Sequence, residues 1–529
     1  MANRDFKLLE SIKVNFKDLI ESYIKESGVD SSVDHPLDKN VLNALAKIAL
    51  KDNDDEYQIF QYHKEINELW KLIIEQSIKC LRYFDTREPF LENKSKKPVA
   101  YGVSELGRYF DKYSEFESML YGGGKNYRDH VLHVFRTWLL GVDCLLENKG
   151  EYLGKISIGR NIKINPLEKL SIWSMIALTH DLGYPLEKSQ EIIEKTKEMM
   201  KSFIVNPIVS MDLSFNGVQN SMNDFVLRFL SSKMHKQTTQ CPVGKSAEKN
   251  ENDTVPPKDS IEKTYVARLQ PKYYFKFQKS LEKSMHGILS SIIIYKLLIY
   301  FLESDFNINE DYTFSEEDTR QFYIRREILR AIAAHTCKDI YHLDMLSFAF
   351  LLIVVDESQE WGRKKISELY VRSNTQYEFK EINPAFNIKT IQINDEEVKL
   401  HKCTVSEKFT LPKEDIGGLK RLLQGLQEQS DKYKEIFRDG QDTAKRNFSF
   451  VKKCEIIYED DKSIPFNIEF IISNDENSSF IVMVGKTGNH KVNAKFDLQF
   501  IQNVFVNHDI KEVEEKEEYT KYTVQDKNV

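Results

Sequence analysis

Apolar positions recur at three- and four-residue steps through the first hundred residues of the chain. Ile66, Leu69 and Ile73 form one such series. This spacing places the side chains on one face of a helix. Residues 1–98 are therefore predicted to form an N-terminal helical region, which ends in a polar loop at Asn93–Val99.

The helical pattern continues through residues 99–372, the second predicted domain. Its longest apolar runs, Ile288–Leu302 and Leu346–Val355, are too short or too interrupted to cross a bilayer, so they are predicted to be buried helices. The segment Gln237–Ser260 is different, because it is rich in Lys, Asn, Ser and Pro and nearly free of large apolar side chains. Such a segment cannot bury enough surface to offset its ordering entropy. It is predicted to be a mobile insertion at about residues 237–260.

Alternation of period two replaces the helical pattern in residues 373–529. The predicted strands are Thr375–Ile382, Thr390–Ile393, Lys399–Val405, Phe448–Tyr458, Asn467–Ile472 and Ser479–Val484. One helix, Ile416–Phe437, lies between them, and a charged, frayed tail begins near Glu512. The predicted fold class is mainly α, with an all-helical core followed by a C-terminal α+β domain. A packing or oligomerisation role is preferred for that domain over ligand sensing.

Composition and charge narrow the class of protein. Of the 529 residues, 41% are hydrophobic and 30% are charged, and the net charge is −7. These values are typical of a globular protein and give no support to a broad basic face for nucleic acid. The N-terminus lacks the apolar core of a secretion signal. The six cysteines are scattered without a C-x-x-C pair, as in reduced cytosolic proteins. A cytoplasmic protein without a membrane partner is expected.

Candidate chemistry begins at the start of an apolar-periodic helix. His130, His133 and Arg136 follow one another at steps of three, so they are expected to share a helical face. Further along, an apolar helix ends in His180-Asp181. Near a helix end, both side chains can reach one metal ion, and the carboxylate can bridge to a second.

Three more residues extend this set. His286 and His335 each lie in or beside an apolar helix, and Asp356 ends the run Phe348–Val355. A carboxylate in that position is costly to bury without a partner or a metal. A single histidine near an apolar helix is more often a hydrogen-bonded core residue than a ligand, but the combination favours a metal site. Imidazole and carboxylate together suit Mn, Fe, Co, Ni or Zn rather than Ca.

The order His…His-Asp…His…His…Asp resembles that of the HD superfamily of metal-dependent phosphohydrolases. Three sequence motifs carry the resemblance: His133-x-x-Arg136, Ala-Leu-Thr-His180-Asp181-Leu-Gly-Tyr-Pro and Val-Val-Asp356-Glu-Ser-Gln-Glu-Trp. It covers about residues 125–363 and leaves the first hundred and the last 150 residues unexplained. The distance along the chain between Asp181 and His286 is long for the family, so an insertion there is expected to reshape the pocket.

The resemblance implies six metal ligands: His133, His180, Asp181, His286, His335 and Asp356. His133, His180, Asp181 and Asp356 would hold the first ion. Asp181 would bridge to a second, which His286 and His335 would complete. The implied reaction is hydrolysis of a phosphate ester, commonly of a nucleotide, by a hydroxide activated between two divalent transition-metal ions.

Such a substrate needs cationic groups near the metals, because charge builds on the phosphoryl oxygens. Besides Asp181, the candidates for a catalytic role are Lys188, Arg136 and His130; Lys188 can equally be a solvated lysine, and a structural ion pair is the preferred role of Arg136. Weaker candidates are Lys125, Arg128, His342 and the glycine run Gly122–Gly124, which can bind an anion or simply form a turn. Gly244-Lys245-Ser246 imitates the end of a P-loop and is discarded.

Two other functions remain open at this stage. The same ligand set serves a branch of di-iron oxygenases, which the ligands alone cannot separate from hydrolases. The second alternative is a regulatory protein that binds nucleotide in an intact site and signals through the C-terminal domain, for example in stress or phage defence. As in large HD proteins, which often self-associate through helices, a homo-oligomer is expected.

Overall fold

The fold is given by a computed structural model, which describes residues 4–30, 33–49, 59–85, 102–123, 130–158, 162–201, 217–240, 261–304, 306–309, 312–340, 344–359, 378–393, 396–411, 416–437, 447–458, 461–473, 479–487, 491–492, 497–516 and 519–526. These residues are mainly helical, with strands in two places along the chain. The coarse fold class expected from the sequence is thereby confirmed. No helix among the described residues combines the length and the apolar character that a membrane crossing requires.

The helices before the C-terminal sheet are α1 (Arg4–Ser27), α2 (Lys39–Ala49), α3 (Ile59–Tyr83), α4 (Val103–Gly123), α5 (Val131–Lys155), α6 (Pro166–Thr179), α7 (Tyr184–Lys201), α8 (Gly217–Ser231), α9 (Pro271–Glu282), α10 (His286–Leu297), α11 (Ile299–Leu302), α12 (Glu316–Ala334), the 3₁₀ turn η2 (Lys338–Ile340) and α13 (Phe348–Ser358). The remaining helices are α15 (Ile416–Phe437) and α16 (Leu498–Val504).

The strands are β1 (Ser232–Gln240), β2 (Ile261–Leu269), β3 (Glu378–Ile393), β4 (Glu396–Leu411), β5 (Asn447–Tyr458), β6 (Asp461–Ser473), β7 (Ser479–Thr487), β8 (Lys491–Val492), β9 (His508–Glu515) and β10 (Tyr519–Asp526).

The chain forms two compact units, and each is discontinuous in sequence. The sheet unit comprises Met1–Leu19, Ser114–Ile156 and Lys338–Val529. The helical unit comprises Ile20–Tyr113 and Ser157–Cys337. The consecutive domains 1–98, 99–372 and 373–529 stay a prediction.

The core of the helical unit forms around α6, which packs against α3 and α12. The Asn165 side chain caps this helix by accepting a hydrogen bond from the Glu168 backbone N–H, and the Glu168 side chain accepts one from the Asn165 backbone N–H. Pro166 occupies the first turn of the helix. Every residue of α6 after Pro166 is buried, so this helix has no face exposed to solvent. Trp70 of α3 donates from Nε1 to the carbonyl of Leu178 at 2.6 Å, which satisfies one of the free carbonyls at the end of α6.

A β-hairpin interrupts the helical unit where the sequence predicted only helices and a mobile insertion. Strands β1 and β2 pair in antiparallel register from Ser232–Leu269 to Gln240–Ile261. The start of the mobile insertion was predicted too early, at residue 237, because residues 237–240 belong to β1. Residues 241–260 lie outside the described residues. The error has a physical cause: Met234 is the only large apolar side chain of β1, so backbone pairing forms this strand without an alternating pattern.

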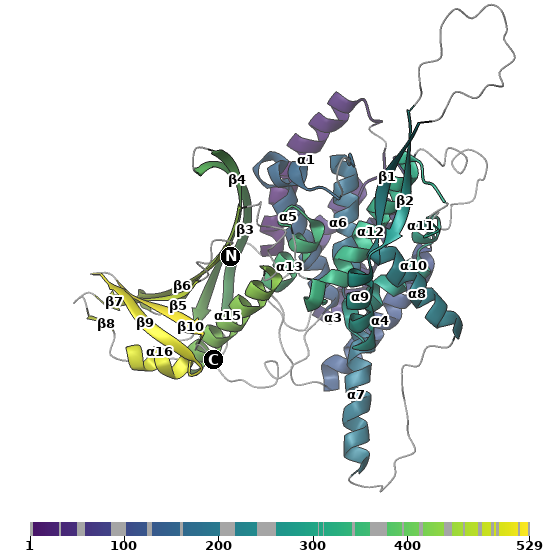
Figure 1. Ribbon diagram of the computed structural model, residues 1–529. Coiled ribbons are helices and arrows are strands. Elements are labelled where there is room, and N and C mark those ends of the chain that lie inside the picture. The colour runs from purple at the N-terminus through teal and green to yellow at the C-terminus, as the bar shows by residue number, and fades with distance from the viewer. Residues whose placement is uncertain are drawn as a thin grey trace, which may run out of the picture. The chain divides into compact units, whose positions relative to one another are not determined.

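The sheet unit contains a sheet with the strand order β3-β4-β5-β6-β7-β10-β9, and β8 pairs with β7. All neighbours are antiparallel except β4 and β5, which are parallel and are connected through α15. Figure 1 shows α15 lying along one face of this sheet. Its apolar stripe of Leu419, Leu423 and Leu426 is buried there, and the helix has the bounds expected from the sequence.

Two expectations for the C-terminal region were wrong. The runs Thr375–Ile382 and Thr390–Ile393 belong to one strand, β3, although residues 375–377 lie outside the described residues. Pro384 interrupts the sequence pattern but is tolerated because β3 is an edge strand, where a missing N–H donor costs little. The charged tail is not frayed, because β9 pairs with β10 and β10 pairs with β7.

Helices α5 and α13 pack against each other and against β3 within the sheet unit. Tyr152 of α5 stacks on Phe386 of β3 with 4.0 Å between ring centroids, and its hydroxyl donates to the carbonyl of Met345 at 2.7 Å. These contacts join the C-terminal part of α5 to β3 and to the residues just before α13.

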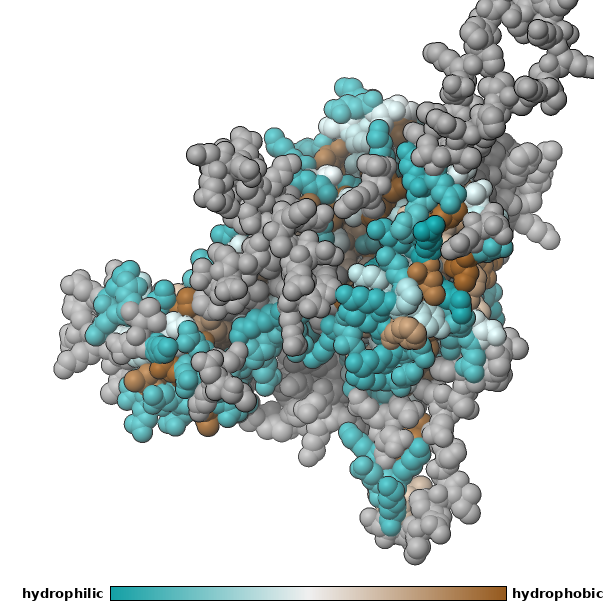
Figure 2. All heavy atoms as spheres, viewed as in Figure 1, coloured by the Kyte–Doolittle hydropathy of each residue, from teal (hydrophilic) through white to brown (hydrophobic). Residues whose placement is uncertain are grey.

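Apolar side chains of the described residues are mostly inside the two units. On the face drawn in Figure 2, hydrophilic residues cover most of the described surface, and apolar ones gather in small patches. Exposed large apolar side chains such as Val14, Met199 and Phe275 come from different helices.

Candidate metal centre

Three helix ends of the helical unit carry candidate ligands. His180 is the C-cap residue of α6 and is followed directly by Asp181, and His335 is the C-cap residue of α12. His286 is the first residue of α10. The carbonyl ends of α6 and α12 carry partial negative charge, which favours a cation beside His180 and His335.

Two glycines allow these helix ends to meet closely. A Cβ on Gly183 would lie 2.4 Å from the carbonyl oxygen of His286, and a Cβ on Gly287 would lie 2.6 Å from that of Ile332. Ser290 of α10 ties the turn after α6 in place, because its hydroxyl donates to the His180 carbonyl at 2.6 Å and accepts from the Gly183 N–H at 2.8 Å. The turn and α10 are therefore held nearer than any larger side chain permits.

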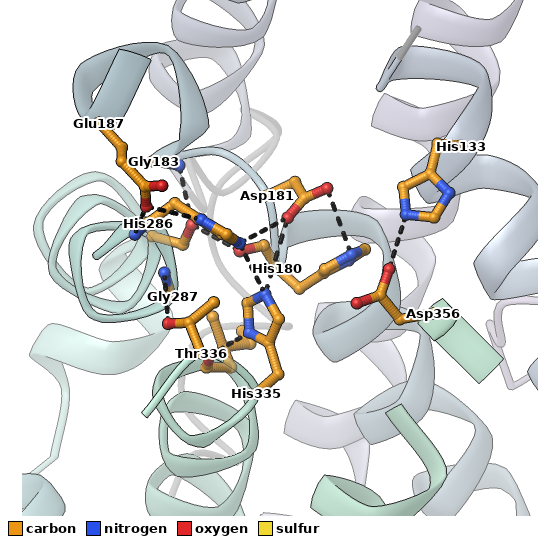
Figure 3. Close-up of polar contacts among 12 residues, drawn as sticks. His133, His180, Asp181, Gly183, Glu187, His286, Gly287, His335, Thr336 and Asp356 are labelled. Carbon is orange, nitrogen blue, oxygen red and sulfur yellow. Dashed lines mark hydrogen bonds and ion pairs between the residues drawn. The ribbon is translucent and has the colours of Figure 1, made fainter. Parts of the chain in front are cut away.

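Asp181 lies at the centre of this cluster (Figure 3). Its Oδ1 is 3.3 Å from His286 Nε2 and 3.6 Å from His335 Nε2. Its Oδ2 is 3.5 Å from His180 Nε2. The two carboxylate oxygens thus face different histidines. The ligand atoms of His180, Asp181 and His335 lie within 4.8 Å of one another, which allows them to share a metal ion.

The Nδ1 atoms of the three histidines all contact protein oxygens. His180 Nδ1 lies 2.8 Å from the carbonyl of Ala177, and His335 Nδ1 lies 2.5 Å from that of Ile332. His286 Nδ1 lies 2.8 Å from Glu187 Oε2, which also accepts the His286 backbone N–H at 2.7 Å. Because carbonyl and carboxylate oxygens only accept, each Nδ1 must carry the proton. In the neutral ring, Nε2 then presents its lone pair to the cluster.

His286 Nε2 and His335 Nε2 face each other at 3.1 Å. Two lone pairs at this distance repel unless a cation, either an additional proton or a metal ion, lies between them. Two nitrogens bound at right angles to one ion at about 2.1 Å would be roughly 3 Å apart. The separation therefore suits two ligands of one ion.

Glu187 of α7 orients His286. Burial by itself raises the pKa of Glu187, but the hydrogen bonds from His286 and the charge of Lys188 lower it overall. The carboxylate is therefore ionised and accepts both His286 N–H groups. The Lys188 ammonium lies 5.2 Å from the centroid of the Tyr184 ring, a cation–π contact, and contributes to the field at Glu187.

Burial lowers the pKa of His335 below its ordinary value. The contact with Asp181 opposes this effect, whereas the neighbouring His286 and His180 reinforce it. His335 is therefore a neutral ring near pH 7, which is the form that binds metal.

The sheet unit brings together the other two candidate ligands. His133 Nε2 of α5 lies 2.7 Å from Asp356 Oδ1, in the last turn of α13 (Figure 3). His133 Nδ1 lies 2.5 Å from Gln359 Oε1, the C-cap residue of α13. Here too Nδ1 donates to an oxygen, so Nε2 faces a carboxylate oxygen and a cation is needed between the two acceptors.

His130 and Arg136 make contacts that differ from those of the candidate ligand His133. His130 is the N-cap residue of α5, with its ring edge-on to that of His133 at 6.2 Å. Arg136 donates from Nε and Nη2 to Asp5 Oδ2 at 3.0 and 2.9 Å. Arg136 thus forms the structural ion pair that was its preferred role.

Several weaker candidates fall outside the described residues: Lys125, Arg128, His342, Gly124 and the segment 244–246. Gly122 and Gly123 are described as the end of α4 rather than as a separate loop.

Sequence reasoning missed the residues that support the ligands: Glu187, Ser290 and Gln359. In the sequence, Glu187 is one of several charged residues in a polar helix, and Ser290 is a polar interruption of an apolar run. Their roles depend on contacts between helices distant in sequence. One local signal existed for Gln359, which follows Asp356 by three residues at a helix end.

No protein-family model, no curated protein and no solved structure matches this chain. The residues themselves are therefore the basis for a functional proposal.

Proposed function

We propose that this chain is a metal-dependent phosphohydrolase that uses two divalent transition-metal ions. One observation carries the proposal: the oxygens of Asp181 face different histidines, with His180 on one side and His286 and His335 on the other. A carboxylate in this arrangement can join two cations, as two-metal hydrolytic centres require.

The residues present fit such ions. Imidazole nitrogens and carboxylate oxygens are ligands that Mn, Fe, Co, Ni and Zn share. The Nδ1 contacts of His180, His286 and His335 supply the outer hydrogen bonds that fix the tautomer of metal-binding histidines. The close Nε2–Nε2 approach of His286 and His335 provides a further reason for a cation.

We further propose that His133 and Asp356 are also metal ligands. Support comes from the order of the six residues along the chain, which resembles that of HD phosphohydrolases, and from the 2.7 Å contact within this pair. Gln359 would orient His133 in the way that Glu187 orients His286.

Bound divalent ions would supply a water of lowered pKa as nucleophile and would stabilise charge on the phosphoryl oxygens. The chain contributes the acceptors and holds them in place through helix ends, Ser290 and the close approaches at Gly183 and Gly287. The proposed substrate is a small phosphate ester, in particular a nucleotide, as the resemblance implies.

The test is turnover by the purified full chain loaded with Mn²⁺. A generic phosphodiester and a panel of ribonucleotides, deoxynucleotides and cyclic nucleotides are offered with and without oxygen. We expect hydrolysis in both atmospheres, and we expect Asp181→Asn to lose both turnover and bound Mn²⁺. The exposed His235→Ala on β1 is the matched control and should behave as wild type.

Metal-loaded protein that leaves the whole panel and the phosphodiester untouched would refute hydrolysis and favour nucleotide sensing. Turnover that stops without oxygen would favour the oxygenase alternative. An Asp181→Asn variant with wild-type metal content would show that Asp181 is not a ligand.

A further inference from the structure

The last turn of α13 carries two adjacent carboxylates with different partners. Asp356 contacts His133 of α5, whereas Glu357 pairs with Lys432 of α15. Neighbouring residues on a helix diverge by about 100°, so the two side chains leave α13 in different directions. The rest of α13 before them is apolar and buried, so these two contacts orient its charged end.

The contact between Lys432 and Glu357 is partly shielded from water, with 32% and 21% of the two side chains exposed. Burial alone would lower the pKa of Lys432, but the charges of Glu357 and then of Asp356 more than offset this and raise it. The ammonium group therefore stays charged and compensates the carboxylate beside the candidate ligand.

Helix α15 is itself anchored to the sheet by a buried polar network. Lys452 of β5 pairs with Glu407 of β4 at 2.7 Å and donates to Gln429 of α15 at 2.6 Å. The side chains of Lys452 and Glu407 are 0% and 2% exposed. One turn further along α15, Tyr433 stacks on Phe450 of β5 with 4.3 Å between ring centroids.

We infer that Lys432 is a positioning residue for Asp356, and that through it the C-terminal sheet supports metal binding by Asp356. The continuous path runs from the sheet to α15, across the Lys432–Glu357 contact, and into the turn that holds Asp356. This inference rests on the proposed function, because it assumes that Asp356 binds a metal ion. The inference gives the sheet a structural role in metal binding by Asp356, and this role does not require the sheet to bind a ligand itself.

The direction of the effect separates positioning from simple electrostatics. Lys432 is a positive charge near a cation site, so its removal would strengthen metal binding if only charge mattered. If Lys432 positions the turn, its removal frees Glu357 and weakens metal binding. Outer-shell partners of metal ligands are typically worth about 10- to 100-fold in affinity.

The experiment is a Mn²⁺ titration of the full chain, with binding measured by calorimetry and by the electron paramagnetic resonance of the bound ion. We expect Lys432→Met to raise the Kd of one ion by about 10- to 100-fold. Lys432→Arg keeps the charge and the contact, and should retain most of the affinity. The control is Lys434→Met on the same helix, which removes a lysine paired with Asp431 of its own helix and should leave the Kd unchanged.

A double-variant cycle with Glu357→Gln completes the test. Because both changes break one contact, the double variant should bind Mn²⁺ no more weakly than Lys432→Met alone. Unchanged or tighter binding in Lys432→Met would overturn the inference while leaving hydrolysis by the wild type intact. A wild type that binds Mn²⁺ but hydrolyses nothing, together with a weakened Lys432→Met, would instead refute the proposed reaction and support the inference.

Discussion

The close approach at Gly183 gives a prediction with a magnitude. A Cβ at this position would lie 2.4 Å from the carbonyl oxygen of His286, 2.7 Å from Leu289 Cβ and 2.8 Å from the Ser290 nitrogen. Ordinary van der Waals contact begins at 3.4 Å, and the two nearest backbone atoms cannot rotate away. In Gly183→Ala, α10 must therefore retreat from the turn by several tenths of an ångström to about 1 Å.

Overpacking of this kind costs about 1–3 kcal/mol. In domains of 150–250 residues, each kcal/mol lowers Tm by about 2–4 °C, and the helical unit, which is somewhat larger, should show a shift near the lower end of that range. The retreat also separates His286 from Asp181, so Mn²⁺ affinity should fall more than stability alone explains. Differential scanning calorimetry of the apo protein and Mn²⁺ titration measure the two effects.

Gly425→Ala is the matched control, because a Cβ there meets nothing within 4 Å. Gly425 lies inside α15, where alanine is favoured over glycine by up to about 1 kcal/mol. The same substitution should therefore raise Tm slightly and leave Mn²⁺ binding unchanged. A Gly183→Ala variant with wild-type Tm and wild-type Kd would refute the steric reasoning.

Two further predictions concern buried ionisable side chains. Lys452→Met leaves Glu407 buried without its ion-pair partner, so the free energy of unfolding measured by urea denaturation should fall by about 3–5 kcal/mol. Adding Glu407→Leu should recover most of this loss, and equal stability of the single and double variants would contradict the prediction. Because burial lowers the folded-state pKa of His335 below 6.5, the unfolded chain binds more protons between that lowered pKa and 6.5. Stability is therefore fully present above pH 6.5 and falls as the pH drops through this window, and bound metal should be lost in the same window. Tm and metal content that stay flat from pH 7.5 to 5.5 would contradict this prediction.

The sequence was informative where function and local structure coincide. His180-Asp181 could be assigned to a helix end because an apolar run stops there and Gly183 follows. The bounds of α15 could be predicted because its leucines form one stripe. In both cases the determinants lie within a few residues of one another.

The parts that could not be predicted depend on contacts distant in the chain. On β10, Thr520, Tyr522 and Val524 are buried in alternation, but the acidic residues around them suggested a solvated tail. The pairing of Glu187 with His286 joins helices separated by the whole β1–β2 segment, so no local pattern indicates it. Supporting residues of a site are in general visible only after the helices are packed.

The most direct test of the central claim is metal analysis of wild type and Asp181→Asn, purified side by side and loaded with Mn²⁺. Two Mn²⁺ ions per chain in the wild type, with spin coupling in the electron paramagnetic resonance spectrum, are the predicted result. Asp181→Asn should lose that coupling and at least one ion, because it replaces one of the two facing oxygens with an amide nitrogen. A wild type without bound Mn²⁺, or a variant with two coupled ions, would contradict the account.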